Sequence, residues 1–197
     1  MTLIVKKFGG TSVGSLERIR DAAALVRDFI AANPGKKVAV VVSAMAGETN
    51  RLIQLAKSCT PDPSPRELDS LLATGEQAST ALFAMALISI GVPARSLDAQ
   101  QAMISTNARH LSAQIEHIQT TRLEEVLEAG EVPVVAGFQG VSEAGDITTL
   151  GRGGSDITAV ALAAALKAES CYIYTDVEGV YSSDPRLCPR TRRLDRI

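Results

Sequence analysis

The sequence is poor in the two residue types that build most metal sites and covalent cross-links. It has three cysteines and two histidines among 197 residues. Cys59, Cys171 and Cys188 are widely spaced with no CxxC pair, and His110 and His117 stand in no metal-ligand pattern. The sequence therefore supports neither a zinc site nor a disulfide framework. We expect thiols kept in a reducing cytosol and histidines that are surface or structural residues.

Charge of one sign and long apolar runs are also scarce. The formal net charge is −2, which gives no general attraction for nucleic acid or for an acidic membrane. No stretch of about 18 unbroken apolar residues is present, and the chain opens with a strand pattern instead of a signal peptide. We therefore expect a cytoplasmic protein without nucleic-acid or membrane partners. A solvated tail is the favoured interpretation of the arginines near the C-terminus, namely Arg186, Arg190, Arg192, Arg193 and Arg196.

Strand and helix patterns alternate along almost the whole chain. Hydrophobic residues make up 46% and charged residues 21%, which fits one globular domain with a substantial core. Continuous apolar strands, as at 38–42, are typical of parallel sheets covered on both faces. The prediction is an α/β fold with a mainly parallel, doubly wound sheet, helices on both faces and ligands at the carboxyl ends of the strands. Strands are expected at 3–5, 38–42, 92–97, 133–138 and 171–174, and helices at 16–30, 51–58, 66–90, 121–129 and 156–167.

Several segments have weaker patterns. Ser15 is expected to cap the first helix, and the long helix at 66–90 could be broken near Thr74-Gly75. Residues 99–118 resist assignment apart from a candidate strand at 114–118, and 139–150 has the pattern of a polar hairpin or flap.

The most informative motif is Gly151-Arg152-Gly153-Gly154-Ser155-Asp156, directly before an apolar helix. Glycines allow close approach to a ligand, and the helix start supplies N–H groups and a positive dipole end. Arg152 can hold a carboxylate with two hydrogen bonds, and Asp156 can orient a cation, either a lysine or Mg²⁺. Capping by Ser155 and Asp156 would explain those two residues but not three glycines and an arginine in one turn. We therefore favour an anion site.

A second glycine turn, Lys7-Phe8-Gly9-Gly10-Thr11-Ser12, follows the first predicted strand. Lys7 could direct its charge at phosphate oxygens while the amides of Gly9 and Gly10 add hydrogen bonds. A tight turn with an exposed lysine is an equally open interpretation. The motif is neither a P-loop nor a dinucleotide fingerprint.

Polar residues outside the two glycine turns extend these candidate sites. Glu76 is expected at a helix start, where it would either complement the helix dipole or receive a substrate ammonium. The hydroxyls of Ser43 and Thr49 could bind an anion or cap the following helix. Near the end of the chain, four residues could form a nucleotide edge or a simple β-hairpin: Thr175, Asp176, Tyr181 and Arg186.

Together these segments resemble the catalytic domain of the aspartokinases, within the amino-acid-kinase family. The matching stretches run in family order over almost the whole chain: V-K-K-F-G-G-T-S-V, V-V-V-S-A-M-A-G-E-T-N, T-G-E-Q-A-S, G-F-Q-G, T-T-L-G-R-G-G-S-D and Y-T-D-V-E-G-V-Y-S-S-D-P-R. The resemblance implies a carbamate-kinase-like fold and Mg-ATP-dependent phosphorylation of the L-aspartate side chain, which begins lysine, threonine and methionine synthesis. It also implies a homo-oligomer.

The resemblance also implies residue roles. Lys7 and Asp156 would be catalytic, with Asp156 organising the charged centre. Glu76 would hold the amino group of aspartate and Arg152 its α-carboxylate, with Ser43, Thr49, Gly153 and Ser155 also in contact with aspartate. The implied ATP-binding set is Lys7, Phe8, Gly9, Gly10, Ser12, Thr175, Asp176, Tyr181 and Arg186. No residue is assigned as a metal ligand.

Aspartokinases continue beyond the point that corresponds to Ile197, with further kinase residues and regulatory ACT domains. We therefore expect residues 1–197 to be a catalytic domain that is incomplete at its C-terminal end. Two alternatives stay open. One is a sister amino-acid kinase acting on acetylglutamate, glutamate or a nucleoside monophosphate, and the other is a binding or assembly fragment without catalysis.

Overall fold

Strands and helices alternate through the computed structural model, which describes residues 2–176, 179, 188 and 190–192. The elements are β1 (Thr2–Phe8), α1 (Leu16–Ala32), β2 (Lys36–Val42), α2 (Glu48–Cys59), α3 (Pro65–Ser89), β3 (Ala94–Leu97), β4 (Ile104–Thr106), β5 (Ile115–Ile118), α4 (Thr121–Glu128), β6 (Val132–Ala136), β7 (Gln139–Ser142), β8 (Ile147–Thr149), α5 (Gly154–Ala165) and β9 (Ser170–Tyr174). The predicted strand positions are confirmed to within a few residues, and Ser15 caps α1 by accepting a hydrogen bond from the Arg18 amide at 3.2 Å.

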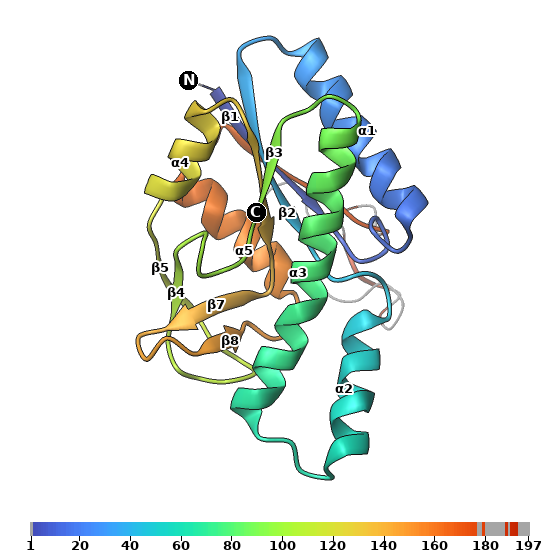
Figure 1. The fold of residues 1–197 in the computed structure, drawn as a ribbon, viewed down its shortest axis with the longest axis vertical. Helices are drawn as coiled ribbons and strands as arrows, with labels where there is room; N and C mark the ends of the chain where they lie inside the picture. Colours follow the sequence, from blue (N-terminus) through green and yellow to red (C-terminus); the bar gives the residue numbers. More distant parts are fainter. Residues whose placement is uncertain (1, 177–178, 180–187, 189, 193–197) are drawn as a thin grey trace.

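The central sheet has the strand order β3-β6-β2-β1-β9, and every pairing in it is parallel. Helices α1 and α3 pack on one face around Phe8, Val40 and Phe83, whereas α4 and α5 cover the other face around Val41 and Leu162 (Figure 1). Because both faces are covered, the strands need no polar alternation. The predicted α/β class with a parallel, doubly wound sheet is confirmed.

A second, smaller sheet has the order β5-β4-β7-β8 and mixes parallel and antiparallel pairs. The polar hairpin, one of the two alternatives expected at 139–150, is confirmed as β7 and β8, and its strand residues Gln139, Thr148 and Thr149 are buried. Strand β5 matches the candidate at 114–118. Strand β4 was missed because three residues are too few to establish an alternating pattern.

Helix α3 runs without a break through Gly75, so the expected interruption is wrong. A Cβ at Gly75 would lie 3.0 Å from the Ala44 Cβ, which means that this glycine allows close packing and does not end the helix. By length and hydropathy α3 could cross a membrane, but half of its most apolar 18-residue stretch is buried inside the fold. The helix also carries the buried acids Asp69 and Glu76. These are the properties of a core helix.

Two other helices start earlier than predicted, and both begin after a glycine in the left-handed region. Gly47 precedes α2 with φ of 81°, and Gly153 precedes α5 with φ of 76°. Neither helix has a side-chain cap. The capping alternative for Ser43, Thr49, Ser155 and Asp156 is therefore not adopted, which leaves these side chains available at the carboxyl edge of the sheet.

Candidate active site

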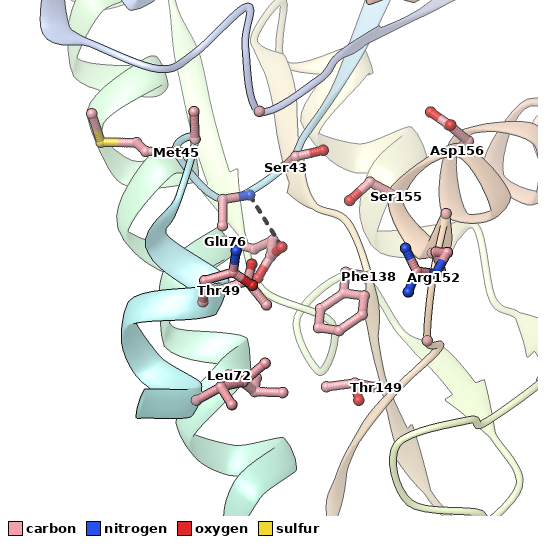
Figure 2. Close-up of a pocket in the computed structure, with 18 of the residues that line it drawn as sticks. Ser43, Met45, Thr49, Leu72, Glu76, Phe138, Thr149, Arg152, Ser155 and Asp156 are labelled. Carbon is pink, nitrogen blue, oxygen red and sulfur yellow. Dashed lines mark hydrogen bonds between the residues drawn. The ribbon is translucent and has the colours of Figure 1, made fainter. Parts of the chain in front are cut away.

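A cavity of about 610 Å³ lies where β1, β2 and β6 end and where α2 and α5 begin. Figure 2 shows Glu76 and Thr49 on one side, Arg152, Ser155 and Asp156 on the other, and the Phe138 ring between them. This is the carboxyl edge at which the sequence predicts ligands. Of the predicted site residues, the cavity is lined by Lys7, Gly10, Ser43, Thr49, Glu76, Arg152, Gly153, Ser155 and Asp156.

Lys7 and Asp156 form an ion pair at this edge, with 2.6 Å between the Lys7 Nζ and the Asp156 Oδ1. Lys7 is the last lysine of β1 and points to the α5 side, while Asp156 lies in the first turn of α5. The Lys7 side chain is 8% exposed and the Asp156 side chain 48%. Asp156 thus fixes a nearly buried ammonium and still faces solvent. The interpretation of Lys7 as an exposed turn residue is wrong.

Glu76 is buried in the middle of α3, so its predicted place at a helix start is wrong. Its Oε1 accepts a hydrogen bond from the Ala44 amide at 3.1 Å (Figure 2), whereas its buried Oε2 has no partner among the described residues. Burial raises the pKa of Glu76 to about 7. A buried carboxylate oxygen without a donor, in the wall of a cavity, is suited to accept hydrogen bonds from a cationic ligand group.

Arg152 lies in the exposed turn between Gly151 and Gly153, both of which have positive φ. Close packing fixes this turn from behind. A Cβ at Gly154 would lie 2.8 Å from Phe138, and one at Gly137 would lie 2.7 Å from the Ser155 Cβ. The glycines of the motif therefore bring the start of α5 against the end of β6, with the arginine presented at the cavity (Figure 2).

The residues predicted to bind nucleotide are only partly at the cavity. The Gly9 amide already donates to the Tyr174 carbonyl at 3.0 Å, so it is not available to a phosphate, which corrects the expectation for that amide. Phe8 is a core residue that stacks on Tyr174 at 4.7 Å between ring centroids. Ser12 donates to the Tyr174 carbonyl.

Thr175 and Asp176 are exposed and follow β9 at the same edge of the sheet. β9 pairs with β1, so these two residues continue the strand beside the Lys7 segment. Tyr181 and Arg186 lie outside the described residues.

Sequence reasoning missed Phe138, although it noted the motif G-F-Q-G. Phe138 lines the cavity and has φ of 68°, a left-handed conformation that is unusual for a bulky residue. Its amide donates to the Thr158 Oγ1 at 3.1 Å and its carbonyl accepts from the Leu150 amide at 2.8 Å. The aromatic residue between glycines at a strand end was the available signal.

His110 is structural, one of the two predicted alternatives, and its Nδ1 lies 2.7 Å from an oxygen of buried Asp69. His117 is exposed. All three cysteines are free, and the described residues contain no cluster of three or more histidine, cysteine or acidic side chains that could hold a metal ion by themselves.

The amino acid kinase family model matches residues 2–197. The chain belongs to the amino acid kinase family. Its similarity to named members is high: the aspartokinase of Pseudomonas aeruginosa is 59% identical over 197 residues, which cover all of this chain and 47% of that relative. This amino acid kinase chain therefore spans about half the length of the curated relatives it matches.

Solved structures of aspartate kinases have the same fold as this amino acid kinase. The Synechocystis aspartate kinase superposes with a TM-score of 0.78 at 50% identity, over 97% of this chain and 31% of that one. Escherichia coli aspartokinase III, solved with aspartate and ADP, superposes with a TM-score of 0.79 at 30% identity, over 98% of this chain and 53% of that one.

Proposed function

We propose that this protein is an aspartate kinase, which transfers the γ-phosphoryl group of Mg-ATP to the side-chain carboxylate of L-aspartate. The products are 4-phospho-L-aspartate and ADP. The observation that carries this proposal is the cavity with a half-satisfied buried carboxylate, Glu76, on one wall and Arg152 on the other. An amino acid presents an ammonium and a carboxylate, and these two walls match them. The similarity to aspartokinases over the whole chain supports the same substrate.

Substrate recognition follows from charge and geometry. Glu76 Oε2 accepts a hydrogen bond from the α-ammonium, because that oxygen lacks a donor within the described part of the chain. Arg152 binds the α-carboxylate through its planar guanidinium. Ser43, Thr49 and Ser155 line the same cavity and donate hydroxyl hydrogen bonds, and Gly153 lets the backbone approach. A substrate whose amine is acetylated has no cation for Glu76, so this site favours a free amino acid.

The chemistry needs charge neutralisation more than it needs a base. An aspartate side chain has a pKa of about 3.9, so the nucleophile is ionised at neutral pH. One of its oxygens forms a bond to the γ-phosphorus while the bond from that phosphorus to the ADP oxygen breaks, and ADP leaves. Lys7 lowers the repulsion between the two anions, and its charge acts strongly because it is nearly buried.

Asp156 is the organiser of this centre. Its contact with Lys7 sets the direction of the ammonium, and its exposed side can meet the metal that accompanies the nucleotide. Mg²⁺ at such sites is held by one or two carboxylates together with substrate phosphates, a requirement that a half-exposed aspartate fits. When bound, Mg²⁺ neutralises phosphate charge.

The remaining parts of the proposal concern the nucleotide and the cell. Gly10 at the cavity and Thr175 and Asp176 after β9 flank the path of the nucleotide, with Tyr181 and Arg186 proposed to complete it. We also propose a cytoplasmic homo-oligomer that supplies lysine, threonine and methionine synthesis.

The test is aspartate-dependent acyl-phosphate formation by the complete protein. ATP, Mg²⁺ and L-aspartate should yield ADP, and hydroxylamine should trap the acyl phosphate as a hydroxamate. N-acetyl-L-aspartate is the matched control, because it keeps both carboxylates and removes the cation. Turnover with an acetylated or phosphate-bearing acceptor but not with aspartate would favour the sister-kinase alternative, and no turnover with any acceptor would favour a non-catalytic role.

A further inference from the structure

Asp69 is a buried acid that the chemistry above does not use. It lies on α3, seven residues before Glu76, with no exposed surface. Leu68 and Leu72, its neighbours on this helix, line the cavity, and Asp69 does not. Any effect of Asp69 on the site therefore acts through other residues.

Three donors from two distant segments converge on the Asp69 carboxylate. The His110 Nδ1 lies 2.7 Å from Oδ2, the Leu111 amide donates to both oxygens at 3.1 and 3.2 Å, and the Thr149 hydroxyl donates to Oδ1 at 2.5 Å. A buried carboxylate destabilises a fold unless such bonds satisfy it, and the donors in turn lose their partner when the carboxylate is replaced. The network therefore ties α3 to the loop before β5 and to the end of β8.

Two of these donors lead directly to the arginine turn. Thr149 is the last residue of β8, three positions before Arg152, and its carbonyl accepts the Ala113 amide at 2.8 Å. Leu111 has φ of 64°, and a Cβ at Gly151 would lie 3.2 Å from its carbonyl oxygen. The Asp69 bond to the Leu111 amide thus supports a strained residue against which Gly151 packs.

We propose that Asp69 is a positioning residue for substrate binding, which fixes the Thr149–Arg152 segment so that the guanidinium faces Glu76 across the cavity. The inference rests on the proposed function, because it assigns Arg152 to the substrate carboxylate. In this arrangement a single helix holds both walls, since Glu76 contacts the ammonium directly and Asp69 positions the opposite charge.

The experiment compares Asp69→Asn, Thr149→Val and Thr149→Ser in the complete protein, with Ser70→Ala as the matched control. Asparagine offers one acceptor oxygen and turns an amide toward the donors. Valine keeps the shape of Thr149 and removes its hydroxyl, and serine restores the hydroxyl. Ser70 adjoins Asp69, but among the described residues its hydroxyl donates to the Arg66 carbonyl, within α3. Two readouts are used: hydrogen exchange of residues 108–113 and 149–153, and steady-state kinetics.

We expect Asp69→Asn and Thr149→Val to raise KM for aspartate about tenfold or more, with KM for ATP and kcat at saturating aspartate within about twofold. Exchange should be faster in both segments, and Thr149→Ser and Ser70→Ala should resemble the unmodified protein. If KM for aspartate in the double variant Asp69→Asn/Thr149→Val is no higher than in Asp69→Asn, the two substitutions act through the same hydrogen bond.

Unchanged KM for aspartate in an active Asp69→Asn protein, with only a lower melting temperature, would overturn the inference and leave a structural role. If Asp69→Asn does not fold, Thr149→Val decides by the same measure. Hydrogen exchange can be measured without activity, so unchanged exchange in the Asp69→Asn protein overturns the inference whether or not the unmodified protein turns over aspartate. A lack of aspartate turnover in the unmodified protein would instead defeat the proposed function.

Discussion

Two buried carboxylates on α3 have opposite hydrogen-bond environments. Asp69 accepts bonds from His110, Leu111 and Thr149, whereas Glu76 accepts the Ala44 amide with one oxygen and keeps the other without a partner in the described part of the chain. Both side chains are removed from water. Because a buried charge is unfavourable unless donors surround it, the first acid stabilises the fold and the second destabilises it until a donor arrives.

The difference teaches that burial alone does not distinguish a structural acid from a receptor. The number of carboxylate oxygens that accept hydrogen bonds distinguishes them. For Glu76, burial without sufficient hydrogen bonding raises the pKa to about 7. A protein that keeps such a group gives up stability where it needs affinity.

The largest expected effect is a contrast in stability between conservative variants of the two acids. Asp69→Asn should lower the free energy of unfolding at pH 8 by about 3 kcal/mol, since it weakens the charged hydrogen bonds of a buried carboxylate and leaves a donor unpaired. Glu76→Gln should cause no comparable loss, because Gln keeps the Ala44 bond and removes an unfavourable charge. Urea unfolding of both variants measures this, and equal losses would break the comparison.

The pH dependence of the free energy of unfolding sharpens the comparison between Asp69 and Glu76. Burial raises the pKa of Glu76 from its ordinary value of 4.5 to about 7 on folding, so the folded state binds more protons between these values. The contribution of Glu76 to stability is therefore largest below pH 4.5 and falls as pH rises toward 7. Relative to the unmodified protein, Glu76→Gln should gain about 2.5 kcal/mol between pH 5 and pH 8. A flat difference would mean that the carboxylate is not destabilised by burial.

The next effect concerns affinity. Glu76→Gln should weaken aspartate binding about 100-fold, because an amide cannot replace a buried carboxylate opposite an ammonium, and a charged hydrogen bond contributes about 1.5–3 kcal/mol. Calorimetric titration of the complete protein with aspartate provides the measurement, and ATP binding serves as the control. Unaltered aspartate affinity would remove Glu76 from the substrate site.

The sequence was sufficient for the sheet, most of the helices and the two glycine turns, because their signals are local. Continuous apolar strands predict a covered parallel sheet, and Gly151 to Asp156 predicts a turn that leads into a helix start. Anion binding at that helix start stays a prediction. The place of Glu76 was missed because Gly75 has the pattern of a break, and its role in packing against Ala44 depends on a residue 31 positions away. The Asp69 network was missed for the same reason, since its donors lie 41 to 80 residues along the chain.

Lys6 and Lys7 illustrate what strand alternation adds. The two residues look equivalent in sequence, yet the pleat of β1 sends them to opposite faces. Lys7 meets Asp156 beside α5, whereas Lys6 donates to the Tyr174 hydroxyl at 2.7 Å and lies 4.2 Å from the centre of the Phe29 ring on the α1 side. Of these two lysines, Lys7 lines the cavity and Lys6 does not.

The smallest expected effect is a pH dependence of kcat/KM for aspartate, which should come from Glu76 and not from Asp69. Protonation of Glu76 removes the partner of the substrate ammonium, so kcat/KM for aspartate should fall about tenfold per pH unit below its pKa, which is about 7 in the free protein. Glu76→Gln should abolish that limb while keeping a low, flat rate, and Ser70→Ala should keep the limb. Profiles taken with aspartate and with ATP as the varied substrate separate binding from phosphoryl transfer, because the proposed contact of Glu76 is with aspartate alone. A limb that survives in Glu76→Gln would assign the titration to another group and leave the two acids of α3 alike in function.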